Sequence, residues 1–364
     1  MEQSLNRKVL RMAWPSVLEN LSTMLVIFAD TAMVGVLGAE ATAAVAVNAS
    51  PSWLINGIII SLGIGGTALV SRSIGAKRED EARHIAQQVI MLGLFVSVLV
   101  FIITLLIAPY VPLLMGSKKE IVAPARDYMR LTALGFILHF TGIMISSQLR
   151  GAGDTKTPMQ AGLISNILNI VFNFILIYET RSLNIFGLNI RLFGLGLGVR
   201  GAAIASAIGM SASGIYIIIK YLSKKIIIYP PKQRYSFDFG LIQRVMRLSI
   251  PAMLERISIN LGQVVFASFV NRIGTVEMAA HHIAITIEAL GYMPGYGFSV
   301  PATALVGQSL GANEPKEAKR LGLKSTAMGV GVMSLMGVVL FVFSRPLMKL
   351  FISDTETQLL GASL

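Results

Sequence analysis

The chain has no cysteine and few charged residues, and each scarcity excludes a class of protein. Without cysteine there can be no disulfide and no thiolate metal site, which excludes disulfide-built secreted domains and zinc modules. Only 14% of the 364 residues are charged, whereas 54% are hydrophobic, which is more apolar surface than a soluble fold can bury. We therefore expect the lipid bilayer to surround most of the chain.

Motifs for nucleotide binding and for enzyme chemistry are also missing. No GxxxxGK[ST] string occurs, so an ion gradient rather than ATP is the expected energy source. The GxGxxG string at 196–201 leads into an apolar run and has no βαβ context. Four histidines without a convergent carboxylate pattern provide neither a nucleophile with its base nor a metal set. We expect no enzyme activity, and no cofactor other than a coupling ion, H⁺ or Na⁺.

Apolar runs of about twenty residues predict an all-α polytopic membrane protein with nine spans, because helices satisfy their own backbone in lipid. The first run follows Arg7, Lys8 and Arg11 and lacks a small-residue cleavage site, so it is interpreted as a resident span. The nine runs lie at 13–37, 44–70, 87–108, 129–148, 159–178, 198–220, 249–271, 280–306 and 325–344.

Positive charges alternate between the two sides of these spans. If the N-terminus is cytoplasmic, the inner segments hold 20 of the Lys and Arg residues and the outer segments hold nine. This bias is typical of a multi-pass protein of the inner (plasma) membrane with its N-terminus inside. The net charge of +12 does not form a continuous basic face, so no nucleic-acid partner is expected. The expected partners are membrane lipid and a small organic substrate, and we expect a monomer.

The first seventy residues return 236 positions later. Pro15 and Glu19 return as Pro251 and Glu255, for example. Six spans separate the two starts, which predicts a parallel repeat of two helical bundles, a construction common among secondary transporters. We expect a complete first bundle of six helices at 1–225, a cytoplasmic linker at 226–247, and a second bundle at 248–364. Because 128–225 has no counterpart, we expect this second bundle to be truncated to about three helices.

An acid in the first span is the strongest functional candidate. Asp30 lies sixteen residues after Trp14, well inside the hydrocarbon, where a carboxylate is costly and is presumed functional. The fifth span places Asn166, Asn169 and Asn173 on one helical face. These amides either bind a cation or a carboxylate, or hold helices together by hydrogen bonds.

Two further sets of polar residues are candidates for substrate contact. Asn48, Ser52 and Asn56 form a stripe in the second span, which either lines an aqueous cavity or serves helix packing. Glu288, in the eighth span, has no basic residue in its span and is expected to contact a cation, a proton or the substrate. Glu19, by contrast, is expected only to hold a helix end near the interface.

Four segments together resemble the multidrug and toxic compound extrusion (MATE) family of efflux transporters. They are Asp30-Thr31-Ala32-Met33-Val34-Gly35, the loop at 150–156, and the paired loops around Gly75 and Gly311. The resemblance implies twelve helices in two six-helix bundles, with a central cleft that exports organic, often cationic, compounds in exchange for Na⁺ or H⁺.

The resemblance also implies roles for single residues. Asp30 resembles the coupling carboxylate of the first bundle, and Asn169 and Asn173 match the fifth-helix pair beside it, a set that can hold Na⁺. Ser206 and the backbone of Ala202 correspond to the sixth-helix part of that site. Two alternatives stay open: a flippase for lipid-linked saccharides of the same superfamily, which should have a strongly cationic cavity, and a non-functional truncated transporter.

Overall fold

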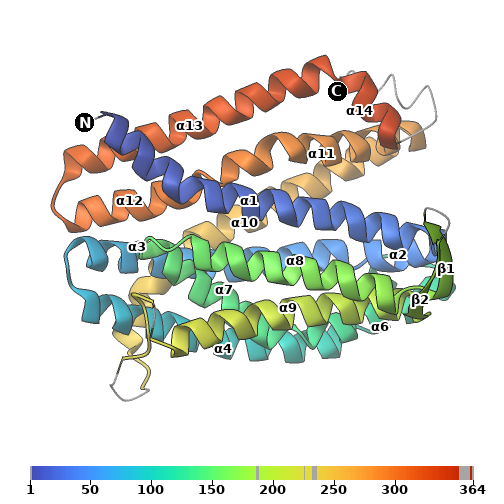
Figure 1. Ribbon diagram of the computed structural model, residues 1–364, viewed down its shortest axis with the longest axis horizontal. Coiled ribbons are helices and arrows are strands. Elements are labelled where there is room, and N and C mark those ends of the chain that lie inside the picture. Colours follow the sequence, from blue (N-terminus) through green and yellow to red (C-terminus); the bar gives the residue numbers. More distant parts are fainter. Residues whose placement is uncertain (1, 186–187, 225, 232–235, 352–360, 363–364) are drawn as a thin grey trace.

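The molecule is an elongated, almost entirely helical assembly (Figure 1). The structure is a computed structural model, and it describes residues 2–185, 188–224, 226–231, 236–351 and 361–362. The helices that precede the predicted linker make up the first half of the molecule. They are α1 (Glu2–Gly35), α2 (Ala39–Ala46), α3 (Ala49–Gly75), α4 (Glu79–Ile107), α5 (Val111–Leu114), α6 (Lys119–Ala133), α7 (Phe136–Gly151), α8 (Lys156–Leu176) and α9 (Gly198–Leu222).

The second half consists of α10 (Phe239–Ile273), α11 (Thr275–Tyr296), α12 (Ser299–Gly311), α13 (Pro315–Val342) and α14 (Ser344–Phe351). Asp238 caps α10 by accepting a hydrogen bond from the Leu241 N–H at 3.0 Å. The last residues of the predicted linker at 226–247 are therefore helical, whereas 232–235 lie outside the described residues.

Six described helices are long and apolar enough to cross a membrane, or seven if the bent pair α6 and α7 forms one span. The predicted runs at 249–271 and 280–306 fall in α10 and in α11 with α12, which are not among the six. The structure thus confirms a multi-pass helical protein, and the count of nine spans stays a prediction.

The all-α prediction was wrong at one place. Between α8 and α9 the chain forms an antiparallel hairpin of β1 (Glu179–Ile185) and β2 (Leu188–Leu195). The Thr180 hydroxyl donates to the Gly194 carbonyl at 3.1 Å and accepts from the Gly194 N–H at 3.2 Å, which fastens the base of the ribbon. We call this side of the molecule the hairpin end, and the opposite side, which carries the turns at 76–78 and 312–314, the basic end (Figure 1).

The two turns of the basic end have the same backbone conformation. Lys77 and Asn313 both adopt a left-handed φ, 59° and 61°, which non-glycine residues rarely do. They are 236 positions apart, the offset of the sequence repeat. The duplication seen in the sequence therefore extends to the fine geometry of the turns.

The two halves touch closely at the basic end. A Cβ added to Gly75 would lie 1.8 Å from the Gln308 carbonyl oxygen, and one added to Gly311 would lie 1.9 Å from the Arg72 carbonyl oxygen. Positions 72 and 308 are again repeat partners, so the contact is reciprocal, as two copies related by an axis along the helices require. The Ser249 hydroxyl adds a hydrogen bond to the Leu62 carbonyl at 3.0 Å.

Helix α1 contacts both halves. Its beginning, with Leu5 and Val9, packs in a buried cluster with Leu305 and Leu321 of α12 and α13. Its remaining length lies along α8, as Figure 1 also shows. The separate core of the first half is built around α7, where Phe140 and neighbouring residues are fully buried against α3 and α4. Asp30, near the far end of α1, is therefore mechanically connected to the contact between the halves.

Candidate cation site and substrate contacts

Asp30 lies against the face of α8 that the asparagine spacing predicts. The Asn173 side-chain amide donates to one Asp30 carboxylate oxygen at 2.5 Å. Asn173 is almost fully buried, and Asp30 is half-buried. Among the described residues Asp30 makes no ion pair with a Lys or Arg. A carboxylate in this environment lacks a fixed counter-charge and can gain one from a bound cation or a proton.

A chain of polar side chains continues from this pair into α9. The Asn173 amide also donates to the Asn169 carbonyl oxygen at 3.2 Å, and the Asn169 amide donates to the Ser206 hydroxyl at 3.2 Å. Ala202 is buried one turn before Ser206, beside Val34 of α1. The first-half residues predicted for the coupling site are thus brought together from α1, α8 and α9.

One oxygen in this cluster has no hydrogen-bond partner. The Asn173 side-chain carbonyl oxygen is buried and unsatisfied among the described residues. A buried polar atom without a partner is costly, and its position next to a carboxylate suits a cation or a water molecule. Sodium is a hard cation, for which oxygen ligands of this kind are appropriate. No cluster of three or more His, Asp or Glu suited to a metal ion occurs in the described part of the chain.

Sequence reasoning missed Tyr128 of α6, which closes the cluster on a fourth side. Its hydroxyl is close enough to interact with Ser206 and Thr132, and its ring packs beside Val34 and Ala202. No pattern in the sequence points to Tyr128, because a tyrosine near the end of an apolar run is commonly an interfacial residue. The site therefore includes side chains from α1, α6, α8 and α9.

The third amide of the α8 stripe has a different role. The Asn166 side chain donates to the Ser22 hydroxyl at 3.0 Å and so joins α8 to α1 by a hydrogen bond. Both interpretations of the asparagine stripe therefore hold, one at each end: Asn166 holds helices together, and Asn169 with Asn173 surrounds Asp30.

The stripe of the second span is divided in the same way. Asn48 is buried, and its amide donates to the carbonyls of Ala44 and Ala125 at 2.9 and 3.0 Å. This corrects the cavity interpretation for Asn48, because both amide hydrogens bind backbone and join α2 to α6. Ser52 and Asn56 are half-buried, and the Asn56 amide donates to the Ser52 carbonyl at 2.9 Å, so their exposure to a cavity stays a prediction.

Glu288 lies exposed on α11, one turn before a pair of tyrosines. Tyr292 and Tyr296 form an edge-to-face pair with ring centroids 5.7 Å apart, and the Arg256 guanidinium lies 6.0 Å from the Tyr296 ring centroid. Arg256 in turn lies beside Gly57 of α3. Aromatic and charged side chains of the second half therefore lie close to α3 of the first half, at the residue after Asn56.

Glu19 does more than hold a helix end. One Arg150 guanidinium nitrogen donates to both Glu19 carboxylate oxygens, at 2.7 and 2.8 Å. The two side chains are only 19% and 24% exposed, and they join α1 to the end of α7. The Gln308 amide of α12 donates to the adjacent Gly151 carbonyl at 3.0 Å, so the loop at 150–156 also contacts the second half.

The comparison with protein families identifies the chain. A family model described as MatE matches residues 15–175 and 251–363, so it covers most of the chain in two segments that start 236 positions apart. The chain belongs to the MatE family. Members of the MATE family are membrane transporters and not enzymes, which confirms the two corresponding predictions.

Relatives and solved structures agree with this assignment. The "Probable multidrug resistance protein NorM" of Thermotoga maritima is 27% identical over 97% of this chain and 73% of its own length. A relative named "FAD transporter" from Shewanella oneidensis is 25% identical over 97% of this chain and 75% of its own. The crystal structure of a MATE transporter in complex with MaL6 has the same fold, with a TM-score of 0.88 at 22% identity.

That structural alignment covers 99% of this chain and 77% of the solved chain. It gives no support to our expectation of a truncated second half. The chain spans about three quarters of the length of these relatives. The prediction of a helical, multi-pass MATE transporter is confirmed.

Proposed function

We propose that this MATE transporter exports small organic, often cationic, compounds in exchange for H⁺ or Na⁺. The observation that carries the proposal is Asp30, a half-buried intramembrane carboxylate without an ion-pair partner in the described residues, held by Asn173. Glu288, Ser52 and Asn56 are proposed to contact the substrate between the two halves. The basic end is proposed to be cytoplasmic, on the strength of the charge bias in the sequence.

Binding of the coupling ion changes the charge of the first half. An ionised carboxylate at the bilayer centre costs about 2.5–3.5 kcal/mol on insertion scales, and a proton or Na⁺ at Asp30 removes this cost. The unsatisfied Asn173 oxygen next to Asp30 offers a second ligand for Na⁺. The Asn169 amide can exchange its donor and acceptor by rotating, and the Ser206 hydroxyl can donate or accept, so both can adjust to either ion.

This change reaches the contact between the halves through α1. The same helix carries Asp30 near one end and packs on α12 and α13 at the other. The halves are in contact at the basic end, so in this proposal the side taken as cytoplasmic is the closed one. Ion binding at Asp30 then repositions α1, and the two halves rock to expose the substrate alternately to each side. Each charge that crosses 100 mV provides about 2.3 kcal/mol, roughly a fiftyfold concentration ratio.

The test is efflux from proteoliposomes with an imposed Na⁺ gradient or pH gradient. Asp30→Asn should abolish gradient-driven efflux and leave thermal unfolding within about 1 kcal/mol of the wild type, because the amide keeps the shape of the side chain. Asn173→Ala should weaken coupling less. Asp80→Asn is the matched control, since its side chain is 99% exposed at the start of α4. Unchanged efflux in the Asp30 variant would refute the assignment, and the gradient that drives efflux identifies the ion.

The flippase alternative is less well supported. It requires a strongly cationic cavity between the halves, and Arg130 lies instead between α6 and α9 of the first half. Because one relative is named a FAD transporter, the substrate panel should include the anionic flavin nucleotide beside organic cations. Efflux of the anion alone would replace the proposed substrate class and leave the coupling site unchanged.

A further inference from the structure

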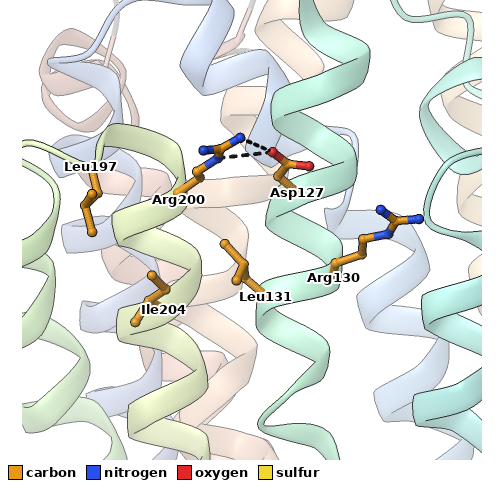
Figure 2. Close-up of a pocket in the computed structure, with 6 residues that line it drawn as sticks. All are labelled: Asp127, Arg130, Leu131, Leu197, Arg200 and Ile204. Carbon is orange, nitrogen blue, oxygen red and sulfur yellow. Dashed lines mark hydrogen bonds and ion pairs between the residues drawn. The ribbon is translucent and has the colours of Figure 1, made fainter.

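A crevice on the outer surface of the first half has the chemistry of a phospholipid site. It measures about 360 Å³, lies between α6 and α9, and is shown in Figure 2. Its lining consists of Asp127, Arg130, Leu131, Leu197, Arg200 and Ile204.

The crevice faces away from the cation site. Successive helical residues differ by about 100° in direction, so residues two apart lie on nearly opposite faces. On α6, Tyr128 points toward Ser206, and Arg130 is two residues further along. On α9, Arg200 precedes the buried Ala202 by two residues in the same way. The two arginines of the crevice therefore point away from Tyr128 and Ala202 of the cation site.

Positive charge exceeds negative charge at this crevice. The Asp127 carboxylate accepts hydrogen bonds from Arg200 at 2.6 and 3.1 Å and from Arg126 at 2.8 and 3.0 Å. Arg130 is exposed and has no hydrogen bond or ion pair with any described residue. Two arginines thus pair with the Asp127 carboxylate, and the guanidinium of Arg130 is left to bind an anion. A guanidinium matches phosphate oxygens in geometry and donates two parallel hydrogen bonds.

The depth of the crevice matches the headgroup region. Arg130 lies 21 residues before the end of α7. The path is about 30 Å along two helices that bend by 51° at their junction, which is comparable to the thickness of the hydrocarbon core. Leu131 and Ile204 provide an apolar floor, and in Figure 2 both lie below the pair of Arg200 and Asp127. A cationic rim above an apolar floor is complementary to an anionic phospholipid, whereas a free phosphate ion would leave the apolar floor unused.

We infer that this crevice binds the phosphate headgroup of an anionic phospholipid, such as phosphatidylglycerol, from the leaflet at the hairpin end. Arg130 binds the phosphate at the rim of the crevice, and the acyl chains lie against Leu131 and Ile204. The lipid would brace α6 against α9, the two helices that position Tyr128 and Ser206. This inference does not depend on the transported substrate or on the coupling ion.

The test is native mass spectrometry of the purified protein after exchange into phosphatidylglycerol or phosphatidylcholine. The wild type should retain phosphatidylglycerol preferentially, and Arg130→Gln should lower its retention about fivefold, the effect of one arginine near an anionic headgroup. The matched control is Lys119→Gln, which removes one exposed positive charge at the start of the same helix and should change nothing.

Three results of the lipid exchange would overturn the proposal. They are equal retention of the two lipids by the wild type, unchanged phosphatidylglycerol retention in the Arg130 variant, and an equal loss in the Lys119 variant. A further arm adds inorganic phosphate at millimolar concentration during the exchange. Displacement of the lipid by this ion would assign the crevice to free anions instead, whereas persistence of the bound lipid supports the phospholipid.

Discussion

Replacing Gly75 with alanine should open the contact between the halves at the basic end. The new Cβ would lie 1.8 Å from the Gln308 carbonyl oxygen, whereas real Cβ contacts essentially never fall below 3.0 Å. The two turns must therefore separate by about 1.2 Å. The obstacle is backbone, which cannot rotate aside like the end of a flexible side chain. Overpacking of this kind costs about 1–3 kcal/mol.

That cost applies only to the state in which the basic end is closed. The equilibrium should therefore shift about 5- to 150-fold toward the state in which this end is open. Gly311→Ala should act alike, since its Cβ would lie 1.9 Å from the Arg72 carbonyl oxygen. Gly75 and Gly311 are equivalent positions of the repeat, 236 residues apart, and lie on opposite sides of the contact between the halves. The two substitutions therefore test this contact independently.

The absence of cysteine makes the measurement direct. Cysteines introduced at Arg78 and Lys316, both exposed near the contact, can be spin-labelled without background, and the distance between labels reports the opening. Gly331→Ala is the matched control, because a Cβ there has nothing within 4 Å. A distance distribution for Gly75→Ala that coincides with those of the wild type and of this control would refute the reasoning.

Two further results are expected. Glu19→Gln should destabilise the protein, because it leaves the largely buried Arg150 without its partner. A double-mutant cycle with Arg150→Gln, measured by unfolding in detergent, should give a coupling free energy of about 1–2 kcal/mol. If the effects of the two substitutions simply add, the two side chains do not stabilise each other. The Leu241 N–H, and then His84, hold the pKa of Asp238 below its ordinary value of 3.8. The stabilisation is present above pH 3.8 and is lost as pH falls through the lowered pKa, so the difference in melting temperature between wild type and Asp238→Ala should shrink there. A difference independent of pH would mean that packing, not charge, is responsible.

Residues that are close in sequence were predictable. Asn169 and Asn173 are four positions apart, so helical geometry alone places them on one face, and an unpaired acid such as Asp30 has few places in a bilayer other than among amides. The repeat was equally predictable, because duplication leaves similar residues at a fixed offset of 236 positions in the sequence.

Contacts between distant segments were not predictable. Glu19 and Arg150 are 131 positions apart, and each has a plausible local role near a helix end. Asn166 and Asn173 have different roles because they face different parts of α1. The spacing of residues within α8 does not show which part of α1 each one faces. The hairpin was not predicted, because its mixture of apolar and polar residues resembles an ordinary loop between two spans. Its strands are defined only by the hydrogen bonds between β1 and β2.

The ribbon of β1 and β2 has a practical consequence for imaging. A membrane protein of 39.2 kDa offers little mass outside the detergent micelle for aligning single particles. The ribbon leaves the helices at a base fastened by Thr180 and Gly194, and a further backbone bond joins the Gly196 N–H to the Tyr178 carbonyl at 2.8 Å. A rigid antibody fragment raised against this ribbon would add a fixed landmark remote from the moving contact at the opposite end, which carries the turns at 76–78 and 312–314.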